Sequence, residues 1–102
     1  MFSVAIDLRC GEATIRLAGE LDVATLPCLE AVVEGLVDAG ATSLVFDCNG
    51  LTFVDWIALR RVASLTRDAT AAGVGLTVRN LSLFTLGVLE VTGLTGLELR
   101  AV

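Results

Sequence analysis

An almost unbroken apolar run, SLVFDC at residues 43–48, restricts the fold of this chain more than any other feature. A strand with apolar side chains on both sides must be covered on both faces, as a central strand of a parallel sheet is. A second run of this kind, VGLTV, occupies residues 74–78. The segments between these runs carry helical apolar spacing, so the sequence predicts an α/β fold with a mostly parallel sheet.

The N-terminal part follows a different pattern, with apolar and polar side chains alternating over residues 2–9 and again over 13–19. Two alternating runs joined by a Gly-containing turn predict an antiparallel hairpin, which would form one edge of the sheet. The segment GELDVAT (19–25) ends the alternation. Further along the chain, Asn49-Gly50 predicts a turn before the run that leads to Asp55.

Three helices and a last short strand complete the predicted order. Pro27 suits the first turn of a helix that ends near Gly40, a second helix covers about 56–72, and a third covers 82–93. Residues 97–102 predict the last strand. The order is therefore β-β-α-β-α-β-α-β, in a single domain spanning residues 1–102, with right-handed crossovers between the parallel strands.

Composition removes several classes of function. The chain has no histidine, so we expect no imidazole metal ligand, no Ser-His or Cys-His nucleophile pair and no enzymatic activity built from side chains alone. No glycine-rich phosphate loop is present, and we expect no cofactor. Seven arginines, no lysine and a net charge of −5 argue against a nucleic-acid partner. Charge-free stretches are too short to span a membrane, and no basic segment precedes an apolar one at the start, so we expect a cytoplasmic protein without membrane insertion.

The three cysteines, Cys10, Cys28 and Cys48, share no C-x-x-C spacing. A redox pair or a reactive thiol is one interpretation. We favour the alternative, that they are small buried apolar residues in a reducing compartment, and we predict three free thiols.

Four segments in order, GELDVAT (19–25), LVFDCNGLTFVD (44–55), NL (80–81) and LEVTGL (89–94), resemble the STAS domain of bacterial anti-sigma factor antagonists. The resemblance covers nearly the whole chain. It implies a small α/β domain that works by binding proteins. In the regulatory branch of the family the partner is an anti-sigma factor with kinase activity, which phosphorylates a serine or threonine directly after the acid at a strand end, in a D-S-S-G-L pattern.

The chain departs from that pattern at the phosphorylated position. The matching residues are Asp55-Trp56-Ile57-Ala58-Leu59, so an indole and a branched aliphatic side chain replace both hydroxyls. The phosphorylation cycle of the family cannot operate at Trp56. We therefore expect binding without a phosphorylation switch at this position.

Helical spacing predicts how the second helix presents these residues. With Leu59 pointing inward, Ile57 points outward and Trp56 lies at the flank, where its ring either plugs the core or meets solvent. Asp55 should cap the helix by accepting a hydrogen bond from the backbone N–H of Ile57 or Ala58. The side chains expected on the buried side are Leu59, Val62, Ala63, Thr66 and Thr70.

The expected partner-binding surface joins the loop of Asp22 to the start of the second helix. For Asp22, a local capping role and a partner contact are equally compatible with the sequence, and capping is the favoured role of Asp55. Glu20 and Thr25 are weaker candidates. The residues of this expected surface are Asp22, Asp55, Trp56, Ile57, Arg60 and Arg61.

A second apolar surface is expected on the third helix, where Leu83 and Leu86 point away from its buried stripe. The favoured function is a regulatory protein-binding module whose partner is an anti-sigma factor or serine-kinase-like regulator, and a homodimer stays open. One alternative is a scaffold or accessory subunit of a transporter or signalling complex. Another is a nucleotide- or small-molecule-binding domain, which rests on fold analogy alone.

Overall fold

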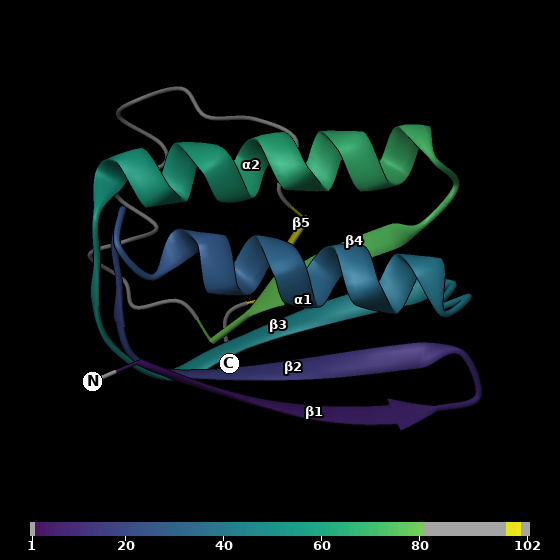
Figure 1. Ribbon diagram of the computed structural model, residues 1–102, viewed down its shortest axis with the longest axis horizontal. Helices are drawn as coiled ribbons and strands as arrows, with labels where there is room; N and C mark the ends of the chain where they lie inside the picture. The colour runs from purple at the N-terminus through teal and green to yellow at the C-terminus, as the bar shows by residue number, and fades with distance from the viewer. Residues whose placement is uncertain (1, 81–97, 101–102) are drawn as a thin grey trace.

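The computed structural model describes residues 2–80 and 98–100, which contain five strands and two helices (Figure 1). The predicted fold class and the predicted element order through the fourth strand are confirmed. The predicted third helix at 82–93, with Leu83 and Leu86, lies outside the described residues. The elements are β1 (Ser3–Arg9), β2 (Glu12–Leu21), α1 (Leu26–Asp38), β3 (Ser43–Val54), α2 (Trp56–Ala71), β4 (Gly75–Arg79) and β5 (Glu98–Arg100).

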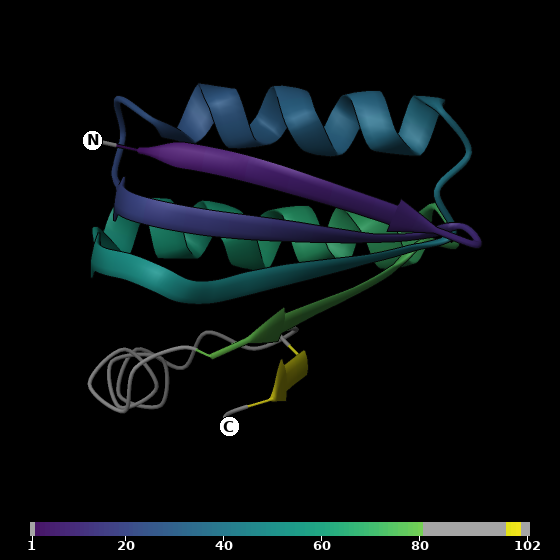
Figure 2. The same ribbon diagram turned by 90° about the horizontal axis from the view of Figure 1, so that it is seen from below.

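The strands form one sheet in the order β1-β2-β3-β4-β5. The hairpin pair β1 and β2 is antiparallel, as predicted, and every later neighbour is parallel. Because the two crossovers through α1 and α2 step across the sheet in the same direction, right-handed connections place both helices on one face. Figures 1 and 2 show α1 and α2 side by side along that face. Both helices begin at the edge where β2 and β3 end.

The core lies between this face and the two helices. Leu44 and Phe46 of β3 and Leu29 of α1 are almost wholly removed from solvent there. Val45, which alternates with them and points to the opposite face, is also only 2% exposed. The apolar run at 43–48 is thus buried on both sides, as a central strand requires.

The predicted turn at Asn49-Gly50 is wrong, because β3 continues through both residues to Val54. β3 holds two more residues than β2 over the paired stretch, and the register shifts at two places, as in β-bulges. A Cβ on Gly50 would lie 2.9 Å from the carbonyl oxygen of Leu17. The glycine therefore allows a close approach of two strands, and β2 likewise extends past Gly19 to Leu21.

The buried side of α2 agrees with the predicted helical phase except at one residue. Leu59, Val62, Ala63 and Thr66 are buried, whereas Thr70 is exposed, and the stripe continues through Ala69 instead. The Thr66 hydroxyl donates to the carbonyl oxygen of Val62 at 3.0 Å, so its burial leaves no polar atom without a partner. Within residues 2–80 and 98–100, no helix is long and apolar enough to cross a bilayer.

Candidate functional site

Two acidic residues come together where β2 and β3 end. Leu21 and Val54 are register partners, and the backbone N–H of Asp55 donates to the carbonyl oxygen of Leu21 at 2.9 Å. Asp22 and Asp55 each follow directly after one of these paired residues. The structure thus brings the loop before α1 and the start of α2 to the same edge of the sheet, as the sequence predicts.

Asp55 is the N-cap of α2. Its backbone is extended (φ −72°, ψ 141°), and its Oδ1 accepts a hydrogen bond from the backbone N–H of Ile57 at 2.8 Å. Its carbonyl oxygen accepts the first helical bond, from Leu59 at 2.9 Å. The predicted cap is confirmed, and it places a carboxylate at the positive end of the helix.

Trp56 and Ile57 both face solvent in the first turn of α2. Ile57 is 53% exposed, in agreement with its predicted outward direction. Trp56 is 46% exposed. Of the two orientations left open by the sequence, the structure therefore has the one in which the ring meets solvent. The guanidinium of Arg60 lies 4.9 Å from the centre of the Trp56 ring, a cation–π contact that orients the indole along the helix surface.

Two further apolar residues at this edge were missed by the sequence analysis. Val23 follows Asp22 and is 56% exposed, and Phe53 lies two residues before Asp55 and is 53% exposed. Phe53 is the register partner of Glu20, one step from the last pair of β2 and β3. Four large apolar side chains are therefore exposed at the ends of two neighbouring strands, which is the composition of an interaction surface.

Asp22 is engaged in its own loop. Its Oδ1 accepts from the backbone N–H groups of Ala24 and Thr25, both at 3.0 Å. The Thr25 hydroxyl in turn accepts from the backbone N–H of Asp22 at 2.9 Å and lies 3.0 Å from the carbonyl oxygen of Glu20. These bonds fix the conformation of the loop, and a partner contact of Asp22 stays a prediction.

Arg61, which was predicted to meet a partner, is held by the neighbouring helix. Its Nε and Nη2 donate to Oε2 of Glu30 at 2.9 and 2.7 Å, and its Nη1 lies 3.4 Å from the hydroxyl of Ser64. The pair is partly buried and joins α1 to α2. Of the two neighbouring arginines, Arg60 is the one that lies against the exposed indole.

The hydroxyls nearest to position 56 in the sequence, those of Thr52 and Ser64, also have partners. The exposed Thr52 hydroxyl donates to the carbonyl oxygen of Gly19 at 3.2 Å, and the partly buried Ser64 lies beside Arg61. Trp56 itself offers no oxygen. The helix start therefore carries an acid and apolar surface, with no hydroxyl in its first turn.

A polar cluster lies on the part of β3 that pairs with β4. Asp47 Oδ1 accepts from Nδ2 of Asn80 at 2.8 Å and from the backbone N–H of Asn49 at 3.1 Å. These bonds, above all that from Asn80, hold the pKa of Asp47 below its ordinary value, with help from the charges of Arg16 and Arg79. The bond to Asn80 ties β3 to the residue that follows β4.

The cysteines are all free, but they are not all buried as expected. Cys48 is buried, whereas Cys10 in the hairpin turn and Cys28 on α1 are exposed. Burial, together with a smaller effect of the negative charge on the adjacent Asp47, raises the pKa of the Cys48 thiol to about 12. Cys48 is therefore an unreactive core residue, and Cys10 and Cys28 are accessible thiols.

The chain was compared with known protein families and with proteins of known structure. Residues 4–100 match a protein-family profile described as "Mlab, STAS domain". The chain belongs to the STAS domain family. No match was found among curated proteins.

The solved structures most similar to this STAS domain include anti-sigma factor antagonists. One from Mycobacterium paratuberculosis has a TM-score of 0.82 at 22% identity, covering 98% of this chain and 86% of that chain. The antagonist SpoIIAA in its unphosphorylated form gives 0.79 at 22% identity, covering 98% and 88%. The Bacillus cell-fate determinant SpoIIAA in its phosphorylated form gives 0.75 at 23% identity, covering 100% and 91%. At this level of identity the likeness establishes the shared fold.

Proposed function

We propose that this STAS domain is a regulatory protein-binding module of the anti-sigma factor antagonist type that binds its partner without a phosphorylation switch at position 56. The observation that carries the proposal is the pair Trp56 and Ile57, about half exposed at a helix start capped by Asp55. Covering exposed apolar groups of this size with a protein partner stabilises the complex.

The similar structures support the choice of partner class, since two of them are anti-sigma factor antagonists. We expect an anti-sigma factor or serine-kinase-like regulator that contacts the edge formed by Asp22, Val23, Phe53 and the first turn of α2. In the family pattern, a phosphate in this turn would place close to two negative charges in the contact. Trp56 and Ile57 remove that means of release and add apolar contact area, so the complex should be constitutive.

Affinity capture from the source cell tests the proposal. Wild-type protein is used as bait beside Ile57→Asp and beside Ile6→Asp, a matched control because Ile6 is 49% exposed on β1. We expect a regulator of the stated class on the wild-type and Ile6→Asp baits and its loss from the Ile57→Asp bait. Equal retention on all three baits would contradict the proposed surface.

A further inference from the structure

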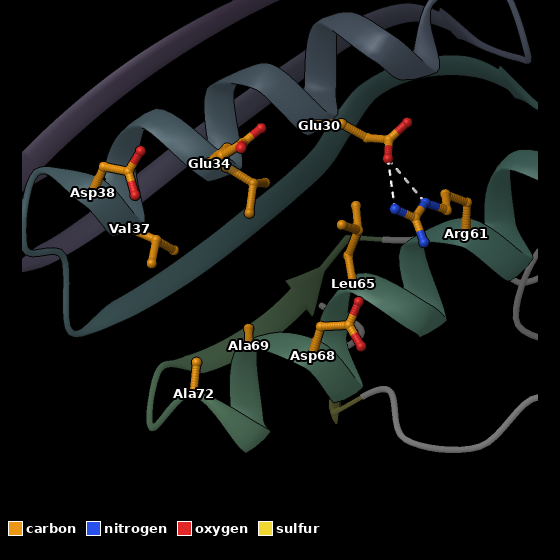
Figure 3. A pocket seen from close by; sticks show the side chains of 10 residues that line it. Glu30, Glu34, Val37, Asp38, Arg61, Leu65, Asp68, Ala69 and Ala72 are labelled. Carbon is orange, nitrogen blue, oxygen red and sulfur yellow. Dashed lines mark hydrogen bonds and ion pairs between the residues drawn. The ribbon is translucent and has the colours of Figure 1, made fainter.

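A groove of about 360 Å³ runs between α1 and α2 on the outer side of the helix layer (Figure 3). Its floor is apolar and is formed by Val33 and Val37 from α1 and by Leu65 and Ala69 from α2. At one end the Glu30–Arg61 pair bridges the two helices. The groove lies beyond the first turn of α2, so it is a different surface from the one proposed above.

Carboxylates line both walls of this groove. Glu30, Glu34 and Asp38 follow one another at four-residue steps along one face of α1, and Asp68 faces them from α2 (Figure 3). Arg61 neutralises Glu30. Within the part of the chain that the structure describes, Glu34, Asp38 and Asp68 make no ion pair. Three negative charges thus border an apolar floor without a cation between them.

Two of these acids, Asp38 and Asp68, lie at positions that destabilise their own helices. Asp38 is the last residue of α1, and Asp68 lies in the last turn of α2. The helix dipole places partial negative charge at these ends, where cationic side chains are favourable and acidic ones are not, and neither last turn holds a basic residue. The far end of the groove therefore combines two negative helix termini with two carboxylates, an environment that a cationic ligand would stabilise.

We propose that this groove binds a basic amphipathic segment of a partner protein, with apolar side chains on the floor and Arg or Lys side chains against Glu34, Asp38 and Asp68. The acidic walls and the apolar floor together favour a basic amphipathic segment. Carboxylates on both walls favour cationic groups. The part of the apolar floor that still meets solvent, Val37 and Leu65, favours apolar side chains. Long cationic side chains meet both needs, because their stems pack on apolar surface while their charged ends reach the rim.

A synthetic peptide of about 15 residues serves as the probe, with leucines on one helical face and arginines on both sides of them, since shorter helices are marginal in water. The protein variant is Glu34→Gln with Asp68→Asn. Its matched control is Asp7→Asn with Glu12→Gln, which also removes two acids but on the hairpin. Circular dichroism melts check that both variants fold. The single variant Asp38→Asn, at the end of α1, provides a second measure should the double variant fail to fold.

Fluorescence anisotropy should show that the groove variant binds the peptide at least about fivefold more weakly than the wild type, while the control changes less than about twofold. A peptide with serine in place of leucine should also bind more weakly. Equal losses in groove variant and control would show general charge attraction and overturn the proposal. Serine-peptide binding as tight as that of the original would do the same, as would no binding by the wild type. A wild-type dimer that dissociates in the groove variant, seen by sedimentation, would mean that a second copy occupies the groove, which also overturns it.

Discussion

Replacing Ile57 by aspartate is the change that isolates the proposed contact. Fully burying an isoleucine side chain contributes about 1.5–3 kcal/mol. Ile57 is already about half buried, so covering the rest with a partner stabilises the complex by roughly 0.8–1.5 kcal/mol. A carboxylate left without a partner in the same contact costs about 1–3 kcal/mol more. The sum of roughly 2–4.5 kcal/mol corresponds to a loss of affinity of more than about tenfold.

The same substitution should leave the fold intact. Position 57 is the second residue of α2, where the helix dipole favours negative charge, and the isoleucine points away from the core. The residues that pack beneath this turn are the buried Ala58 and Leu59. We therefore expect the melting temperature of Ile57→Asp to remain within a few degrees of the wild-type value.

Titration calorimetry with the captured regulator measures the effect, and Ile6→Asp again provides the control. The control should bind like the wild type, because Ile6 lies on the edge strand β1 and is exposed to a similar degree. Unchanged affinity of Ile57→Asp would refute the assignment of the surface. A large fall in its melting temperature would refute the outward placement of Ile57.

Three further outcomes are expected. Asp55→Ala should destabilise the protein by about 1 kcal/mol, because the helix loses its cap, and should lower the melting temperature by roughly 4–8 °C; no change would show that the cap is dispensable. Maleimide at pH 7 should label Cys10 and Cys28 quickly and Cys48 only after unfolding, because burial raises the pKa of the Cys48 thiol to about 12; equally fast labelling of all three would contradict this burial. Ionised Asp47 contributes stability that is present above its ordinary pKa of 3.8 and is lost as the pH falls further through its lower folded pKa. As the pH is lowered below about 4, the urea midpoint of unfolding should therefore fall less steeply for Asp47→Asn than for the wild type.

The sequence pattern predicted correctly those elements that depend on residues close together in the chain. The alternation in the hairpin, the apolar run at 43–48 and the acid at the start of α2 each predicted an element or a cap that the structure contains. Asn49-Gly50 failed as a turn because the edge of β2 offers β3 hydrogen-bond partners beyond this dipeptide. The strand absorbs the two residues through register shifts instead of ending there.

Phe53 was missed for a different reason. The two register shifts together leave Val54 on the same face as Phe46 and Phe53 on the opposite face. A central strand is expected to be covered on that face too, as it is at Val45, so the exposure of Phe53 was not predicted. The partner of Arg61 was hidden for another reason. Glu30 precedes it by 31 positions, and only the packing of α1 against α2 brings the two together.

Incubating the complex with Mg-ATP tests the central claim of binding without a phosphorylation switch most directly. The retained protein is followed by size-exclusion chromatography, and its intact mass is measured, with Trp56→Ser as a variant that restores a hydroxyl at the family position. We expect that the wild-type complex stays together and that the mass of the chain does not change. Release of the partner with a stoichiometric phosphate on Thr52 or Ser64 would contradict it, because the switch would then have moved to a neighbouring hydroxyl.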